Sequence, residues 1–139
     1  CPMPRRWPIV LLIAWTALTL TAACSAPAAP TVRAVLFWGE NCPHCHQVIE
    51  RDLPPLQERF GEQLEIKMIR LSDPAGYEMW AEVLAEFRVP RERQGVPMLV
   101  IGDDVLIGSY EIPEMLPALI ERHLEAGGVD YPDIAGLRE

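Results

Sequence analysis

The stretch Cys42-Pro43-His44-Cys45 stands between a run of strand-forming residues and a run with helical spacing. Two cysteines with two residues between them can pass between a dithiol and a disulfide. The loop that this pair closes is too short to stabilise a fold, because the entropic benefit of a crosslink grows with loop length. The pair therefore indicates redox, metal or haem chemistry.

The residues on either side of the pair predict a strand and a helix. Residues 32–38 are apolar and rich in β-forming residues, which predicts a buried strand. From Cys42 to Phe60 the apolar side chains fall on one helical face. Pro54-Pro55 predicts a kink or break in that helix, because proline lacks an amide donor and clashes with the preceding turn.

Periodicity and turn residues predict the remaining elements. In chain order, we expect a half-buried strand at 64–71, a helix at 74–87 that starts at Ser72-Asp73-Pro74, a hairpin of strands at 98–101 and 105–108, a helix from Ile112-Pro113 to Gly127-Gly128, and a loosely packed tail at 130–139. The order is β-α-β-α-β-β-α. It predicts an α/β domain with a central mixed sheet and helices on both faces.

Residues 32–126 resemble a small thioredoxin-like domain of the type found in exported bacterial thiol-disulfide oxidoreductases. The matching residues are Phe37-Trp38, Cys42-Pro43-His44-Cys45, and the run from Gly95 through Val96-Pro97 to Gly102. The Pro-His pair between the cysteines is that of the DsbA-like disulfide oxidases. The large helical insertion of those oxidases is absent, since only about 25 residues separate Leu71 from Val96.

The resemblance implies roles for four candidate catalytic residues. Cys42 is expected to be the exposed attacking thiol and Cys45 the more buried resolving thiol, with no cofactor beyond their disulfide. The helix N-terminus, where Pro43 lies, would stabilise the Cys42 thiolate, and a protonated His44 would add to this. A stabilised thiolate favours the dithiol and makes the disulfide more oxidising. A solvated loop histidine is the alternative for His44.

The resemblance also implies a substrate-binding surface. Pro97 is expected to be a cis-proline that faces the disulfide and shapes a groove. Val96 would present its backbone to an extended substrate peptide. Trp38 is a further candidate for substrate contact, although a core aromatic is its simplest interpretation. The expected partners are therefore proteins that carry thiols or disulfides.

Two positions depart from the thioredoxin pattern. Thioredoxins proper carry a buried acid six residues before the first cysteine, where this chain has Leu36. The residue directly before the first cysteine is Asn41 instead of tryptophan. These departures favour an oxidase or isomerase over a reductase, and they leave the direction of exchange open.

His46 supports a second interpretation of the motif. Cys-x-x-Cys-His is also the attachment signature of c-type haem. That function needs His46 and a second axial ligand, for which Met98 and Met115 are candidates, whereas the strand that leads into the motif argues against a cytochrome. Zinc would need a second pair of ligands at the usual spacing, so we expect no metal. A non-enzymatic lipoprotein binding domain is the remaining alternative.

The N-terminal residues predict export. Residues 1–23 join Arg5-Arg6 to an apolar run and small residues, which is typical of a signal peptide, with an uncleaved membrane anchor as the alternative. Residues 20–24 resemble a bacterial lipobox, with Cys24 as the lipidated residue and Thr21 where leucine is usual. Residues 24–31 read as a linker, and 127–139 as a C-terminal tail.

Charge and location complete the prediction. The chain has 20 acidic and 12 basic residues and a net charge of −8. All 20 acids but only ten bases follow Cys24, so that part carries about −10 (10 minus 20). The absence of a basic cluster argues against nucleic acid as a partner. We expect an extracytoplasmic, membrane-anchored domain that meets a redox partner in the membrane.

Overall fold

The computed structural model describes residues 26–138. Four strands and four α-helices follow one another as β1 (Val32–Trp38), α1 (Pro43–Gln47), α2 (Leu53–Phe60), β2 (Leu64–Arg70), α3 (Pro74–Glu86), β3 (Met98–Ile101), β4 (Asp104–Ile107) and α4 (Gly108–Glu125). A π-helical segment, Val48–Asp52, joins α1 to α2, and short 3₁₀ turns lie at Gly61–Gln63 and Arg91–Arg93. No helix among residues 26–138 has the length and apolarity needed to cross a membrane.

The strands form one mixed sheet in the order β2-β1-β3-β4. β1 pairs with β2 in parallel, and this requires a crossover, which α1 and α2 supply. β3 is antiparallel to both of its neighbours, and Phe37 near the end of β1 pairs with Met98 at the start of β3. The residues that follow β1 and those that precede β3 therefore meet at one edge of the sheet.

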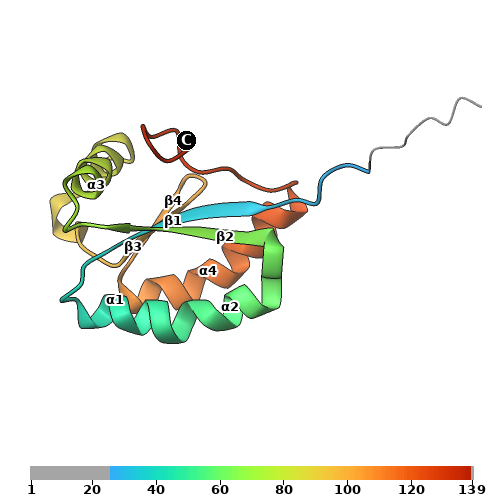
Figure 1. The fold of residues 1–139 in the computed structure, drawn as a ribbon, viewed down its shortest axis with the longest axis horizontal. Helices are drawn as coiled ribbons and strands as arrows, with labels where there is room; N and C mark the ends of the chain where they lie inside the picture. Colours follow the sequence, from blue (N-terminus) through green and yellow to red (C-terminus); the bar gives the residue numbers. More distant parts are fainter. Residues whose placement is uncertain (1–25, 139) are drawn as a thin grey trace, which may run out of the picture.

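Side chains on the two faces of the sheet form separate cores. On one face, β1 and β3 pack against the run from α1 to α2 and against α4, through residues such as Leu36, Leu99 and Ile120. On the other face, Phe37, Val83 and Met98 belong to a core beneath α3. Figure 1 shows α1, α2 and α4 together on one side of the sheet and α3 on the other. The observed order and layers confirm the predicted fold class.

The crossover helix differs in form from the predicted kinked helix. The backbone N–H of Leu53 bonds to the carbonyl of Val48, five residues back, which is the π-helical pattern. Pro54 lacks an amide donor, and in a regular helix its ring would clash with the carbonyl four residues earlier. The wide turn ends at Asp52, so that Pro54 and Pro55 lie in the first turn of α2, where helices tolerate proline.

The last helix begins four residues earlier than predicted, at Gly108 instead of Ile112. The carboxylate of Glu111 accepts the backbone N–H of Ile107, at 2.8 Å, and so satisfies a donor at the helix start. Gly108 has a φ of +98°, a left-handed conformation that glycine adopts readily, at the junction of β4 and α4. The prediction started the helix at its first proline and missed this cap.

The expectation of a loosely packed tail is wrong. Ile134 and Leu137 are buried in the core beneath α3, at 5% and 0% exposure. The ammonium of Lys67 donates to the carbonyl of Leu137 at 2.6 Å and lies 4.9 Å from the ring centre of Tyr131. Figure 1 shows the C-terminal segment on the same side of the sheet as α3. The tail therefore helps to cover the sheet.

Candidate functional site

Cys42 occupies the N-cap of α1, directly after the loop that follows β1. Its backbone is extended, and its Sγ accepts the N–H of Cys45 at 3.1 Å. Pro43 follows in the first turn, where a missing amide donor costs nothing. The two cysteines form a disulfide with a Cα–Cα distance of 5.2 Å. Sequence reasoning placed the pair at a helix start, and the structure places it there.

The two sulfurs differ in exposure. Cys45 is fully buried, at 0%, whereas Cys42 at the helix start is only partly buried. An incoming sulfur can therefore reach Cys42 and cannot reach Cys45. After reduction, a Cys42 thiolate would keep the N–H of Cys45 as a partner and face the positive end of the helix. This asymmetry corresponds to the predicted division between an attacking and a resolving cysteine.

Val96-Pro97 lies against this pair, across the sheet edge. The peptide bond between Val96 and Pro97 is cis. The carbonyl oxygen of Val96 is 3.8 Å from the Sγ of Cys42. A disulfide sulfur carries no proton, so the thiol of the reduced form is the state that can donate to this carbonyl. Pro97 in turn accepts the N–H of Gly108 at 2.9 Å, which ties the segment to the start of α4.

His44 projects from α1 toward the start of α4. Its Nδ1 lies 3.0 Å from the Oγ of Ser109, and both groups are accessible to solvent. His44 also lines a shallow depression at the surface, whose other lining residues are Val96, Ile107, Gly108, Ser109, Tyr110 and Glu111. Sequence reasoning missed Ser109 and its neighbours. No motif marks them, and the fold brings Ser109 to His44 from 65 residues away.

His46 makes more contacts than a solvated helix residue. Its Nε2 lies 2.8 Å from the carbonyl oxygen of Glu40, and its Nδ1 lies 3.3 Å from the carboxylate of Glu50. The hydrogen bond to the Glu40 carbonyl is the main reason that the pKa of His46 lies above its usual value. Desolvation of the ring opposes this increase, whereas the hydrogen bond and charge of Glu50 add to it. Half-buried Trp38 meets the imidazole edge to face, with ring centres 6.2 Å apart.

The remaining predicted positions lie as follows. Leu36, where thioredoxins carry an acid, is fully buried among apolar side chains. Asn41 is exposed in the loop before Cys42. Within residues 26–138 no three His, Cys, Asp or Glu side chains are grouped so that they could hold a metal ion. Cys24 and residues 1–23 lie outside the described residues, so the predictions of a signal segment and of lipidation stay predictions.

Some solved structures of other proteins are similar to this chain. No protein-family model and no curated protein matches the chain. Among similar solved structures, a solution structure of a thioredoxin from Thermus thermophilus is 23% identical, with a TM-score of 0.49, over 70% of this chain and 77% of that one. A malarial protein is 18% identical, with a TM-score of 0.45, over 68% of this chain and 98% of that one. The fold assignment rests on the chain's own strand order, crossover and layers.

Proposed function

We propose that the chain is a thiol-disulfide oxidoreductase that exchanges disulfides with protein thiols through Cys42 and Cys45. The observation that carries the proposal is the unequal exposure of two bonded sulfurs at a helix N-terminus. One sulfur is open to a substrate, and the other is held behind it. A structural crosslink needs no such asymmetry, whereas a two-step exchange does.

The exchange proceeds in two displacements. A substrate thiolate attacks the Sγ of Cys42, the Cys42–Cys45 bond breaks, and Cys45 leaves as a thiolate that takes up a proton. A second substrate thiolate then attacks the substrate sulfur of the mixed disulfide, and Cys42 leaves. Two electrons pass from the substrate dithiol to the cysteine pair, and the substrate gains a disulfide. The reverse sequence reduces a substrate disulfide.

The surroundings of Cys42 support the oxidising direction. The N–H of Cys45 and the helix N-terminus stabilise a thiolate on Cys42. A lower pKa makes Cys42 a better leaving group and stabilises the dithiol, which makes the disulfide more oxidising. The apolar side chain of Leu36 provides no acid or base behind the pair. An oxidase of this kind needs re-oxidation, and we propose a membrane protein that accepts the electrons through its own disulfide.

The depression beside Cys42 supports a peptide as the substrate. The Val96 carbonyl faces the reacting sulfur, and an extended chain could pair with the backbone there. The contacts of His46 favour this chemistry over haem attachment. Its two ring nitrogens lie against Glu40 and Glu50, and a haem would have to bond covalently to the fully buried sulfur of Cys45.

We also propose that the reaction takes place outside the cytoplasm, on a membrane. The support is the sequence of residues 1–24 alone, with its basic and apolar segments and its lipobox-like end. Expression in a bacterium with and without Cys24→Ala tests this. With labelled fatty acid in the medium, the parent chain should take up the label and the variant should not. Absence of label from the parent, or equal labelling of both forms, would contradict lipidation at Cys24.

Single cysteine variants test the activity. In an assay that follows oxidation of a reduced protein, Cys42→Ser should abolish exchange, because the accessible sulfur is lost. Cys45→Ser cannot form the disulfide, so it should not oxidise the reduced protein either. Given a protein that carries a disulfide, its Cys42 thiolate should attack that disulfide and accumulate mixed disulfides, because the resolving thiol is lost. Ser109→Ala, a substitution outside the pair, should retain exchange. Normal turnover by either cysteine variant would disprove the assignment.

The reduction potential of the Cys42–Cys45 couple tests the direction. Equilibration with glutathione buffers, followed by mass spectrometry of the trapped thiols, measures it. A reduction potential of about −120 mV is that of a strong oxidant, whereas one of about −270 mV is that of a reductant. A potential near that of a reductant would be consistent with an oxidoreductase but would contradict the proposed oxidising direction.

A further inference from the structure

His46 bridges the loop before the active site and the helix after it. Its Nε2 is 2.8 Å from the carbonyl oxygen of Glu40, in the loop between β1 and Cys42. Its Nδ1 is 3.3 Å from the carboxylate of Glu50, one turn further along the helix. Both partners are acceptors only. A neutral imidazole has one N–H and can donate to one of them, whereas an imidazolium donates to both.

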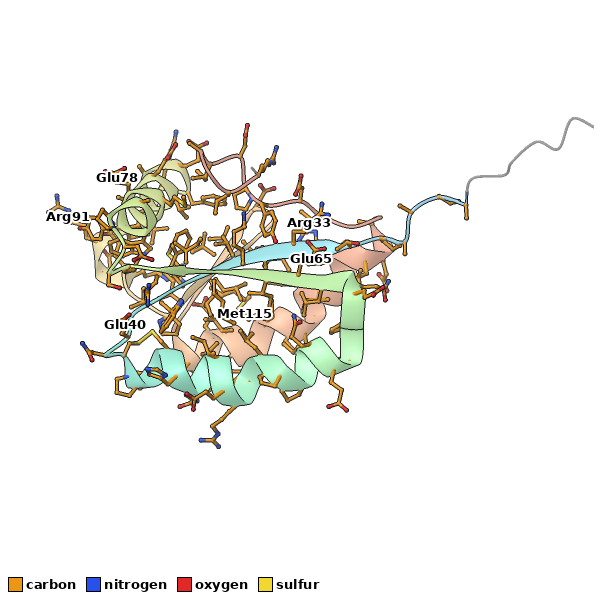
Figure 2. All side chains as sticks on the ribbon, viewed as in Figure 1. Arg33, Glu40, Glu65, Glu78, Arg91 and Met115 are labelled. Carbon is orange, nitrogen blue, oxygen red and sulfur yellow. A yellow bond between two sulfur atoms is a disulfide. The ribbon has the colours of Figure 1, made fainter. Side chains whose placement is uncertain are left out.

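Two acids, Glu40 and Glu50, lie near His46, and the carboxylate of Glu40 already has a partner. Glu40 directs its own carboxylate to Arg70 at the end of β2, at 2.7 Å, and Arg70 also approaches Asp73 at 3.5 Å. Figure 2 shows Glu40 at this end of the molecule, beside the start of α1. Trp38 is the uncharged neighbour from β1. Glu50 is thus the acid left to pair with His46, while the positive end of the helix opposes a charge on the imidazole.

The backbone connects His46 to the reacting sulfur. The N–H of His46 bonds to the carbonyl of Cys42 at 3.2 Å, so His46 lies one turn from the N-cap. Glu40, whose carbonyl His46 holds, is two residues before Cys42. The imidazole is therefore linked to Cys42 by the helix backbone and by the loop that contains Glu40.

We infer that His46 is a positioning residue that, as an imidazolium held between Glu40 and Glu50, fixes the loop before Cys42 and stabilises the Cys42 thiolate. The inference deepens the proposed function and rests on it. It assigns to His46 a tuning role that the motif alone suggested for His44. Thiolate formation at Cys42 and protonation of His46 then favour each other, and the coupling is the same in both directions.

The reciprocity gives a test that needs no substrate. The imidazole signals of the protein are followed by NMR against pH, once in the disulfide form and once in the dithiol form. The inference makes Cys42 of the reduced protein a thiolate, one turn from His46, so the pKa of His46 should be higher in the dithiol form, by about half a unit to one unit. His46→Gln assigns the signal among the three histidines. Equal values in the two forms would overturn the inference.

Variants test the same coupling from the side of the sulfur. Glutamine can accept or donate but carries no charge, so His46→Gln should raise the pKa of the Cys42 thiol by the same amount. Glu50→Gln leaves His46 in place and should raise it less. Glu58→Gln removes one exposed acid further along the same run of helix and should leave it unchanged. An unchanged Cys42 thiol in both His46→Gln and Glu50→Gln would also overturn the inference.

The proposed function and the role of His46 can be disproved independently of each other. Both titrations are made on the isolated protein, and neither depends on turnover. A chain that showed the coupling but no exchange with any protein thiol would disprove the proposed function and keep the tuning role. A chain that exchanged disulfides without the coupling would keep the proposed function and reduce His46 to a structural residue.

Discussion

Gly76 determines how closely α3 approaches the end of β2. It is buried in the first turn of α3, and a Cβ built on it would overlap the carbonyl oxygen of Arg70 and lie 3.0 Å from the Cγ2 of Ile69. The first of these atoms belongs to the backbone and cannot rotate away. The missing side chain is therefore a packing requirement at this position.

Gly76→Ala should destabilise the protein, although alanine is the better helix former. The gain in helix propensity is about 1 kcal/mol, and forcing α3 away from β2 should exceed it, for a net loss of about 1–3 kcal/mol. Chemical denaturation measures the change. Gly95→Ala is the matched control, because a Cβ there meets nothing within 4 Å, and it should be nearly neutral. Equal effects of the two substitutions would refute the packing argument.

His46 should make the stability depend on pH. Its folded pKa lies above the unfolded value of 6.5, chiefly because the Glu40 carbonyl accepts a hydrogen bond. The stabilisation is therefore complete below the unfolded pKa and is lost as the pH rises through the folded pKa. The denaturation midpoint of the disulfide form should decrease as the pH rises from the unfolded to the folded pKa of His46. His46→Gln should reduce this decrease. An identical pH profile in the variant would contradict this.

Elements were predictable where local patterns decide them. The strand at 32–38, the helix start at Asp73-Pro74 and the turn at Gly102 follow from apolar runs, a proline and a glycine, and the structure has all three. The register of Arg33 and Glu65 across β1 and β2, where they form the ion pair labelled in Figure 2, depends on the pairing of distant strands. No local pattern encodes that pairing.

The tail shows the same limit on the scale of an element. Residues 130–138 have no helical or strand period, and this led to the prediction of loose packing. Their apolar side chains instead fill the part of the sheet that α3 leaves open, as the burial of Ile134 and Leu137 shows. A sequence pattern reports secondary structure, whereas this segment is ordered by contacts between side chains and a sheet formed far upstream.

Leu137→Ala tests whether the tail stabilises the fold. Leu137 is fully buried and lies beside Ile134 in the core beneath α3. Removal of a buried leucine side chain costs about 2–5 kcal/mol, and we expect a loss of this size. Asp133→Ala is the control, since its side chain is 92% exposed. Thermal denaturation compares the stabilities of the two variants. An unchanged stability of Leu137→Ala would mean that the packing of the tail does not stabilise the fold.

The candidate site as a whole combines motif and topology. The cysteine pair was visible because two cysteines and a helix start lie within a few residues. Val96-Pro97 could be paired with them only through the resemblance, because an antiparallel β3 beside β1 is what brings both to one sheet edge. Ser109 and Glu40 could not be found, since one arrives through α4 and the other acts through its backbone carbonyl.

Reduction should couple to the stability of the whole molecule. The disulfide closes a short loop, so chain entropy gives it only a small stabilisation, which does not depend on pH. The dithiol gains from a Cys42 thiolate at the N-cap, held by the N–H of Cys45. A folded thiol with a lowered pKa contributes stability that is present above the unfolded value, about 8.5, and is lost as the pH falls through the folded value.

The difference in unfolding free energy between the dithiol and disulfide forms should therefore rise in favour of the dithiol as the pH rises from the folded pKa of Cys42 to the unfolded value of about 8.5. Each unit by which the fold lowers the Cys42 pKa should add about 1.4 kcal/mol to that rise. Urea denaturation of both forms at several pH values measures it. Groups that titrate identically in the dithiol and disulfide forms contribute equally to both unfolding free energies. Their contributions therefore cancel in the difference. His46→Gln should reduce the rise, because the charge that stabilises the thiolate is gone. A difference that stayed constant with pH would mean that the fold does not stabilise the thiolate, and the oxidising direction would lose its physical basis.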